Sequence, residues 1–157
     1  MGLENLIKAA YKESVNGNRR GDKLEEIKSI QDYIKSSKRI IVPNWNQEKV
    51  NVINKVLSEF NLSEAEHLEF HTNSADLSRM PAITKAQMAL DLCDCDLVIA
   101  RGRLGVPGSG SLMVILDSKG RILTGATSPS HVVHNKDLTE AVRDEITICL
   151  ERIGFKK

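Results

Sequence analysis

Short strand-like segments that alternate with amphipathic helices constrain the fold of this chain more than any other feature. Three such strands are expected, at residues 39–43, 65–72 and 96–100. Helical periodicity fills both intervals, at residues 47–60 and 74–93, and the second helix is interrupted or restarted at Pro81. Strands that are joined through a helix pair in parallel, because the helix carries the chain back across the sheet. The sequence therefore predicts a sheet with a parallel part and crossover helices.

The C-terminal part predicts an antiparallel addition to this sheet. Strands are expected at residues 111–117 and 121–127, and the short link between them suits a hairpin with Gly120 in the left-handed region. A closing helix is expected over residues 137–153, ended by Gly154. Its inward face is expected to hold Leu138, Val142, Ile146 and Leu150.

Two further helices are expected before the first strand. One covers residues 2–15, and the other runs from an N-cap at Asp22 to about residue 36. The inward face of the second helix is expected to hold Leu24, Ile27, Ile30 and Ile34. The whole pattern predicts an α/β fold with a mixed sheet flanked by helices, and the length suits a single domain over residues 1–157.

The overall composition excludes several classes of partner. The chain carries 22 Lys and Arg against 21 Asp and Glu, a formal net charge of +1, and has no long basic run. This balance does not favour a nucleic-acid partner, so any recognition of charge must be local. The apolar runs are far shorter than a membrane span, and the N-terminus has the pattern of a helix and not of a secretory signal. With 3 cysteines, an odd number, we expect a cytoplasmic protein without a membrane partner.

A glycine-rich segment, RGRLGVPGSGS, follows the strand at residues 96–100. Glycine lets backbone N–H groups approach a phosphate, arginine offers a fork of donors, and ligands of open α/β sheets bind beyond the carboxyl ends of parallel strands. We therefore expect a phosphate site, although the pattern is neither a Walker A loop nor G-x-G-x-x-G. The candidate residues are Arg101, Gly102, Arg103, Gly108, Ser109 and Gly110. A tight turn is the alternative, and it explains the glycines but not the arginines.

A second loop follows the strand at residues 39–43 and leads into a helix with Asn46 and Lys49 near its start. A helix N-terminus together with a lysine favours an anion. On spacing alone, a plain strand-to-helix turn with a solvated Lys49 is the alternative. Trp45 either stacks on a base or packs against the fold.

Polar side chains also gather after the last expected strand. Thr127 and Ser128 offer hydroxyl groups, and His131 is a candidate phosphate donor or general acid or base. The alternative is turn chemistry around Pro129 with surface histidines. The pattern assigns no ligands for a metal.

The sequence resembles the inosine-triphosphate pyrophosphatase fold in two stretches. Asn46 and Lys49 match its N-x-x-K, and Lys85 matches the lysine of its N-A-x-x-K-A helix. The resemblance implies a nucleoside triphosphate site with Lys85 among the phosphate-binding residues. Where that family has a pair of acidic residues, this chain has Arg101 and Gly102. Such a pair holds the metal that activates water, so its replacement argues against simple hydrolysis.

A closer resemblance, carried by residues 99–134 and by the chain length and order of elements, is to the HcgB family of methanogenic archaea. It implies a homodimeric guanylyltransferase with an inosine-triphosphate-pyrophosphatase-like fold. Such an enzyme transfers GMP from GTP to the hydroxyl of a substituted pyridinol and releases pyrophosphate, in biosynthesis of the iron-guanylylpyridinol cofactor of [Fe]-hydrogenase.

Taken with the loops, this resemblance places GTP between the two loops, with Arg101 and Lys49 as catalytic residues and Mg²⁺ as the expected cofactor. Two alternatives stay open. A nucleoside triphosphate pyrophosphatase would release a monophosphate without any acceptor, and a non-catalytic nucleotide-binding module would bind without forming a product.

Overall fold

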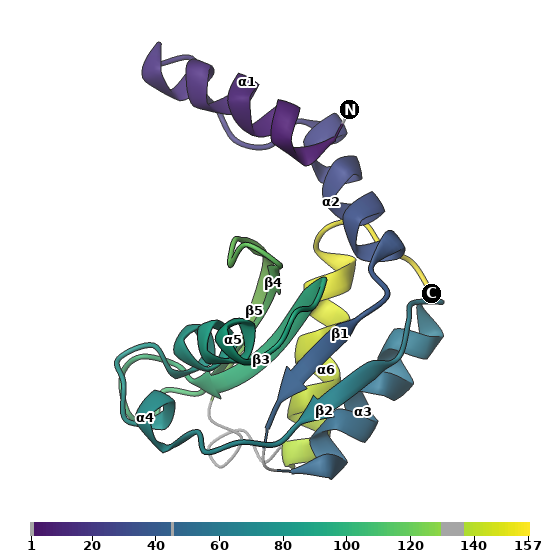
Figure 1. The fold of residues 1–157 in the computed structure, drawn as a ribbon, viewed down its shortest axis with the longest axis vertical. Helices are drawn as coiled ribbons and strands as arrows, with labels where there is room; N and C mark the ends of the chain where they lie inside the picture. Colours follow the sequence, from purple (N-terminus) through teal and green to yellow (C-terminus); the bar gives the residue numbers. More distant parts are fainter. Residues whose placement is uncertain (1, 45, 130–136) are drawn as a thin grey trace.

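The computed structural model describes residues 2–44, 46–129 and 137–157 (Figure 1). The helices are α1 (Leu3–Val15), α2 (Leu24–Ser36), α3 (Gln47–Glu59), α4 (Asn73–Asp76), α5 (Pro81–Leu92) and α6 (Leu138–Glu151). The strands are β1 (Ile40–Pro43), β2 (Ala65–Leu68), β3 (Leu97–Arg103), β4 (Ser111–Asp117) and β5 (Ile122–Ser128). Within this described part, no helix is long and apolar enough to cross a membrane.

The strands form one mixed sheet in the order β2-β1-β3-β4-β5. Strand β1 pairs in parallel with β2 and with β3, whereas β4 pairs antiparallel with both of its neighbours. The helical crossovers through α3 and α5 produce the parallel part, and short connections produce the antiparallel part. The predicted α/β fold with a mixed sheet and flanking helices is confirmed.

Helices cover the two faces of the sheet differently (Figure 1). Helices α3 and α6 pack on one face, where Ile99 and Met113 of the sheet share one buried cluster with Val142 and Ile146 of α6. Helix α5 covers the other face over β3, and it packs there through Ala82, Ala86 and Ala89, each 0% exposed. Small side chains let a helix approach closely, so the first turn of α5 lies directly against the end of β3.

Helices α1 and α2 form an arm that extends beyond the end of the sheet at which β1 begins (Figure 1). The base of the arm is anchored by Ile34, which is 2% exposed, and by the Gln31 amide, which donates to the Ile153 carbonyl at 2.5 Å. Near the start of α1, Glu4 pairs with Lys119 at 3.1 Å and with Arg121 at 3.0 Å on the turn between β4 and β5. The arm is thus tied to the body through the inward face of α2 and through Glu4 of α1.

Two expectations for the arm are wrong. The residue that caps α2 is Lys23 and not Asp22, whose carboxylate instead accepts from Arg19 at 3.4 Å. Leu24 is 89% exposed although the helical spacing places it on the inward stripe. The stripe is buried only where α2 reaches the sheet, and Leu24 lies at the far end of the helix, beyond the core.

The boundaries of strands β3 and β2 differ from the expected ones by several residues. Strand β3 continues to Arg103 because residues 101–103 complete a ladder with residues 111–113 of β4, so the connecting loop covers only 104–110. Strand β2 ends at Leu68 because its partner β1 ends there. The predicted interruption of the helix before β3 is confirmed, since α4 ends at Asp76 and Pro81 occupies the first turn of a new helix, α5.

Candidate functional site

A cavity of about 370 Å³ lies at the carboxyl ends of the parallel strands, where α3 and α5 begin. Loop 104–110 and the end of β5 complete its wall. The lining residues are Lys49, Asp76, Lys85, Arg101, Gly102, Arg103, Gly108, Gly110, Ser111 and Pro129. Ligands of open α/β sheets bind at this edge, so the cavity is the candidate functional site.

Local structure brings the cationic side chains into this cavity. Side chains alternate along a strand, so Arg101 and Arg103 lie on the same face of β3, with Gly102 on the other. Lys49 lies in the first turn of α3, and Lys85 lies one turn into α5. Two helix N-termini thus flank a cavity that already holds four cationic side chains, an arrangement that favours a multiply charged anion.

Lys85 and Asp76 hold each other at the edge of the cavity. The Lys85 ammonium donates to the Arg101 carbonyl at 3.0 Å and lies 3.3 Å from an Asp76 carboxylate oxygen. The other Asp76 oxygen accepts from the Thr72 hydroxyl at 2.8 Å, and Thr72 is itself buried. Asp76 is therefore held in position while its side chain remains about half exposed, at 47%.

Lys49 is the least engaged cation of the cavity. Among the described residues, no carboxylate lies within ion-pair distance of its ammonium. Burial, followed by the nearby positive charges of Arg101 and Lys85, lowers the pKa of the Lys49 amine. An anion bound beside Lys49 would offset both the cost of burying the ammonium charge and its repulsion by Arg101 and Lys85. The cavity therefore favours a negatively charged ligand.

Arg101 is anchored from behind by a buried carboxylate that the sequence analysis did not single out. Its Nε atom donates to Glu145 of α6 at 2.7 Å, and its Nη2 atom donates to the Ser111 hydroxyl at 2.8 Å. Glu145 is 0% exposed and also accepts hydrogen bonds from the Ser111 and Ser128 hydroxyls. The sequence signal that could have identified Glu145 is its position beside Ile146 on the inward face of α6. A carboxylate that is buried there requires a cation or hydrogen-bond donors as partners.

Two glycines of the candidate site have a steric role that the structure reveals. A Cβ atom on Gly102 would lie 2.6 Å from the Ala82 backbone nitrogen and 2.9 Å from Pro81 Cβ. Gly110 has a φ of +132°, and a Cβ atom there would collide with the Ser128 carbonyl oxygen. Gly108 has a φ of +81° with open space beside it. The first two glycines therefore allow the close packing that shapes the cavity.

Arg103 lines the cavity but donates mainly to backbone carbonyls. Its guanidinium donates to the Ser78 carbonyl at 2.8 Å and to the Gly105 carbonyl. Arg79 donates to the same Gly105 carbonyl at 3.1 Å. Arg103 therefore ties loop 104–110 to the link between α4 and α5.

The other predicted site residues that the structure describes lie outside the lining of the cavity. Asn46 caps α3, since its side-chain oxygen accepts from the Glu48 N–H at 2.9 Å. Ser109 donates within its own loop, to the Leu104 and Val106 carbonyls. Thr127 is exposed on the opposite face of β5 from Ser128, which is buried against Glu145. His131 and Trp45 lie outside the described residues.

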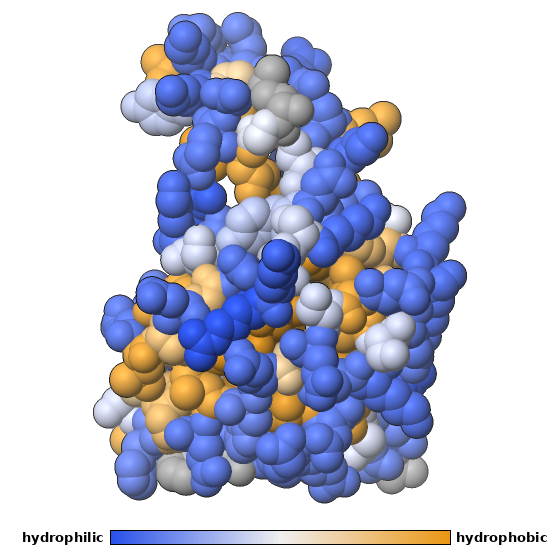
Figure 2. Space-filling view, turned by 45° about the vertical axis from the view of Figure 1, so that its right-hand side comes forward, coloured by the Kyte–Doolittle hydropathy of each residue, from blue (hydrophilic) through white to orange (hydrophobic). Residues whose placement is uncertain are grey.

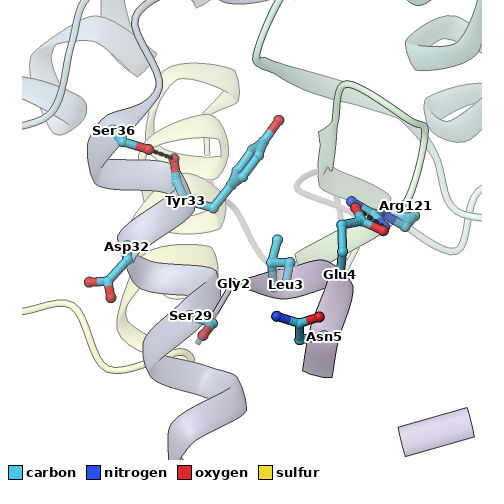
Figure 3. A pocket seen from close by; sticks show the side chains of 9 residues that line it. All are labelled: Gly2, Leu3, Glu4, Asn5, Ser29, Asp32, Tyr33, Ser36 and Arg121. Carbon is cyan, nitrogen blue, oxygen red and sulfur yellow. Dashed lines mark hydrogen bonds and ion pairs between the residues drawn. The ribbon is translucent and has the colours of Figure 1, made fainter. Parts of the chain in front are cut away.

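A second cavity, of about 570 Å³, lies between the arm and the turn that joins β4 to β5 (Figure 3). Leu3, Glu4 and Asn5 of α1 face Tyr33 of α2 across it, and Glu4 points toward Arg121 (Figure 3). The Arg121 guanidinium is already paired with Asp117, at 2.6 Å, and with Glu4. Although this cavity is larger, its single lining cation is neutralised, so the smaller cavity remains the candidate site.

A mixed α/β sheet with a cation-rich cavity at the ends of its parallel strands is typical of α/β proteins that bind anionic ligands. Comparison with known families agrees with this class. Residues 3–155 match the family model described as FeGP cofactor biosynthesis protein HcgB, guanylyltransferase. The chain belongs to the HcgB family, as the sequence resemblance predicted, and is thus an enzyme of the nucleotidyltransferase class that acts in FeGP cofactor biosynthesis. The likeness to the inosine-triphosphate pyrophosphatase fold stays a prediction.

Proposed function

We propose that this protein transfers GMP from GTP to the hydroxyl of a substituted pyridinol and releases pyrophosphate, in the cytoplasm of a methanogen that makes [Fe]-hydrogenase. The observation that carries the proposal is the cavity at the ends of β1 and β3, where Lys49, Lys85 and Arg101 converge in a chain of a guanylyltransferase family. Its volume of about 370 Å³ lies within the range of small-molecule sites, roughly 300–1,000 Å³.

The cations have distinct roles in this reaction. Within the described residues, no hydrogen bond engages Arg101 Nη1, so this edge of the guanidinium is available to a phosphate while the other edge is held by Glu145. Lys49, without a carboxylate partner among the described residues, supplies a positive charge from the start of α3. Transfer of a phosphoryl group depends on positioning and on stabilising charge on the leaving group, so these side chains would bind the triphosphate and stabilise the departing pyrophosphate.

Among the described residues that line the cavity, Asp76 supplies the one carboxylate that could bind the expected Mg²⁺. In the described ranges, no group of three or more His, Cys, Asp or Glu side chains could hold a metal by itself. Mg²⁺ keeps several waters and often binds through one or two carboxylates together with substrate phosphates. Asp76, fixed by Thr72 and half exposed at the cavity, would hold it, and the ion would offset charge on the phosphates.

Homodimer formation is part of the proposed function, and the arm supports it. Ile7, Tyr11 and Val15 of α1 are 41%, 70% and 67% exposed. Figure 2 shows apolar side chains at the surface of the arm, which stands clear of the body. These apolar side chains are exposed to water in one copy of the chain, so a second copy that covers them would stabilise α1. Light scattering of the wild type and of the Ile7→Ser/Tyr11→Ser variant tests this: we expect a dimer that the variant dissociates.

Incubation with GTP and Mg²⁺, with and without a hydroxypyridine acceptor, tests the reaction. We expect pyrophosphate and a guanylylated product only when the acceptor is present. Release of pyrophosphate and GMP without acceptor would instead indicate a nucleoside triphosphate pyrophosphatase. Binding of GTP without either product, at any concentration of acceptor, would contradict the transferase. The Asp117→Asn variant, altered far from the cavity, is the control for general damage to the fold.

A further inference from the structure

A cluster around the fully buried Glu145 lies directly behind the candidate phosphate site and joins three strands to a helix. Glu145 of α6 accepts from Arg101 of β3, from Ser111 of β4 and from Ser128 of β5, and Ser111 Oγ lies 3.1 Å from Ser128 Oγ. The Glu145 side chain is 0% exposed, whereas that of Arg101 is 12% exposed. We propose that Glu145 is a positioning residue that orients the Arg101 guanidinium toward the phosphates of the nucleotide.

The geometry excludes direct contact between Glu145 and a ligand. Both carboxylate oxygens are occupied: Oε1 accepts from Arg101 Nε at 2.7 Å, and Oε2 accepts from Arg101 Nη2 at 3.2 Å and from both serine hydroxyls. With no exposed surface, and with both oxygens already bonded to Arg101, Glu145 neither takes a proton from a substrate nor coordinates an ion. Any effect of Glu145 on the reaction must pass through the side chains that it holds at the cavity, Arg101 and Ser111.

The same contacts define which part of Arg101 faces the ligand. The Nε and Nη2 edge of the guanidinium is held by Glu145 and Ser111, which leaves the Nη1 edge toward the cavity. Arginine loses considerable rotamer freedom when it binds an anion, and a guanidinium that is already fixed avoids that loss during binding. Ser111 and Ser128 in turn hold the Glu145 carboxylate in place. Hydrogen bonds of this kind, one layer behind a binding site, commonly orient the groups that contact a ligand.

The chain contains a matched buried pair that serves as a control. Asp117 is also 0% exposed and accepts from an arginine Nε atom, that of Arg121, at 2.6 Å. This pair lies at the other end of β4 from Ser111, away from the cavity. Substitution of either carboxylate by its amide removes a buried charge, but only Glu145→Gln releases an arginine at the candidate site.

Calorimetric binding of inorganic tripolyphosphate tests the positioning role without requiring turnover. We expect Glu145→Gln to weaken tripolyphosphate binding by about tenfold or more, whereas Asp117→Asn keeps the wild-type affinity although it lowers the melting temperature. In the Arg101→Lys background, which removes the planar fork, Glu145→Gln should add little to the loss. Wild-type affinity in folded Glu145→Gln, or an equal loss in Asp117→Asn, would overturn the inference.

A spectroscopic readout separates orientation from stability. We expect the Arg101 Nε–H signal, assigned by its absence in Arg101→Lys, to be resolved and protected from exchange in the wild type and to be lost in Glu145→Gln. An unchanged signal in Glu145→Gln would contradict the positioning role. The relevance of the positioning role to catalysis rests on the proposed function. If that function holds, Glu145→Gln should lower kcat for guanylyl transfer. If the wild type transfers no GMP but the tripolyphosphate results hold, the proposed function fails and the positioning role stands.

Discussion

Replacement of Gly102 by alanine is the most direct test of how the cavity is built. A Cβ atom at this position would lie 2.6 Å from the Ala82 backbone nitrogen and 3.0 Å from the Pro81 carbonyl carbon, both in the first turn of α5. Ordinary contact begins at 3.4 Å, so the start of α5 must move by about 0.8 Å. The neighbours are mainly backbone atoms, and a rotamer change cannot relieve the contact.

The expected cost of Gly102→Ala is that of overpacking a rigid interface, about 2 kcal/mol of unfolding free energy. For a chain of this size the melting temperature should fall by roughly 6 °C, which leaves the protein folded at room temperature. Because α5 also carries Lys85, whose ammonium donates to the Arg101 carbonyl at 3.0 Å, tripolyphosphate affinity should fall as well. Scanning calorimetry and binding calorimetry measure both effects.

Gly2→Ala is the matched control, since a Cβ atom on Gly2 would meet nothing within 4 Å. That variant should keep the wild-type affinity, and its melting temperature should fall by less than that of Gly102→Ala, because only the N-cap of α1 changes. A Gly102→Ala protein as stable as the wild type would refute the view that β3 and α5 are in rigid contact. A destabilised Gly102→Ala protein with unchanged affinity would refute the link between that contact and the cavity.

Three further predictions concern charge. Since the pKa of Lys49 is lowered by burial and by neighbouring cations, GTP affinity should fall as the pH rises through that lowered pKa, and Lys49→Arg should remove this dependence in binding calorimetry. Arg101→Ala should lower the unfolding free energy by about 3–5 kcal/mol, measured by urea denaturation, because it leaves Glu145 buried without a cation. Glu145→Gln removes the buried charge, so the Arg101→Ala/Glu145→Gln double variant should be more stable than Arg101→Ala alone. A double variant that is no more stable would contradict the reasoning. The Arg19 guanidinium, together with the Lys23 backbone N–H, lowers the pKa of Glu26 from 4.5 to about 2. The stability that this pair contributes is thus present above pH 4.5 and is lost as the pH falls toward 2, and thermal unfolding of Glu26→Gln should lack this part of the acid dependence.

The sequence predicted the order of helices and strands well because apolar periodicity records which face of each element is buried. Gly120 has the predicted left-handed φ, at +80°. Where burial depends on distance from the core and not on periodicity, the prediction was wrong, as at Leu24. The end of β3 was missed for a related reason: Arg101 and Arg103 have the composition of a loop, and only pairing with β4 makes them part of a strand.

Prediction of the candidate site was more uneven. Lys49, Arg101 and Gly102 line one cavity because loops at the ends of adjacent parallel strands meet at one edge of the sheet. Asn46 has the residue type of a ligand but performs the more common role of a helix cap. Glu145 could not be assigned from its own neighbourhood, since its partners are 17 to 44 residues away in the chain. The roles of these site residues in binding and catalysis stay predictions.

The position of the arm has a practical consequence. The arm leaves the sheet at the end where β1 begins, and the cavity lies where β1 finishes, so the length of the sheet separates the two. A fluorophore or a surface linker attached to the polar side of α1, for example at Lys8, would stand away from the ligand entrance. Single-molecule and surface-immobilised assays can thus attach the protein through the arm while the cavity stays open to solution.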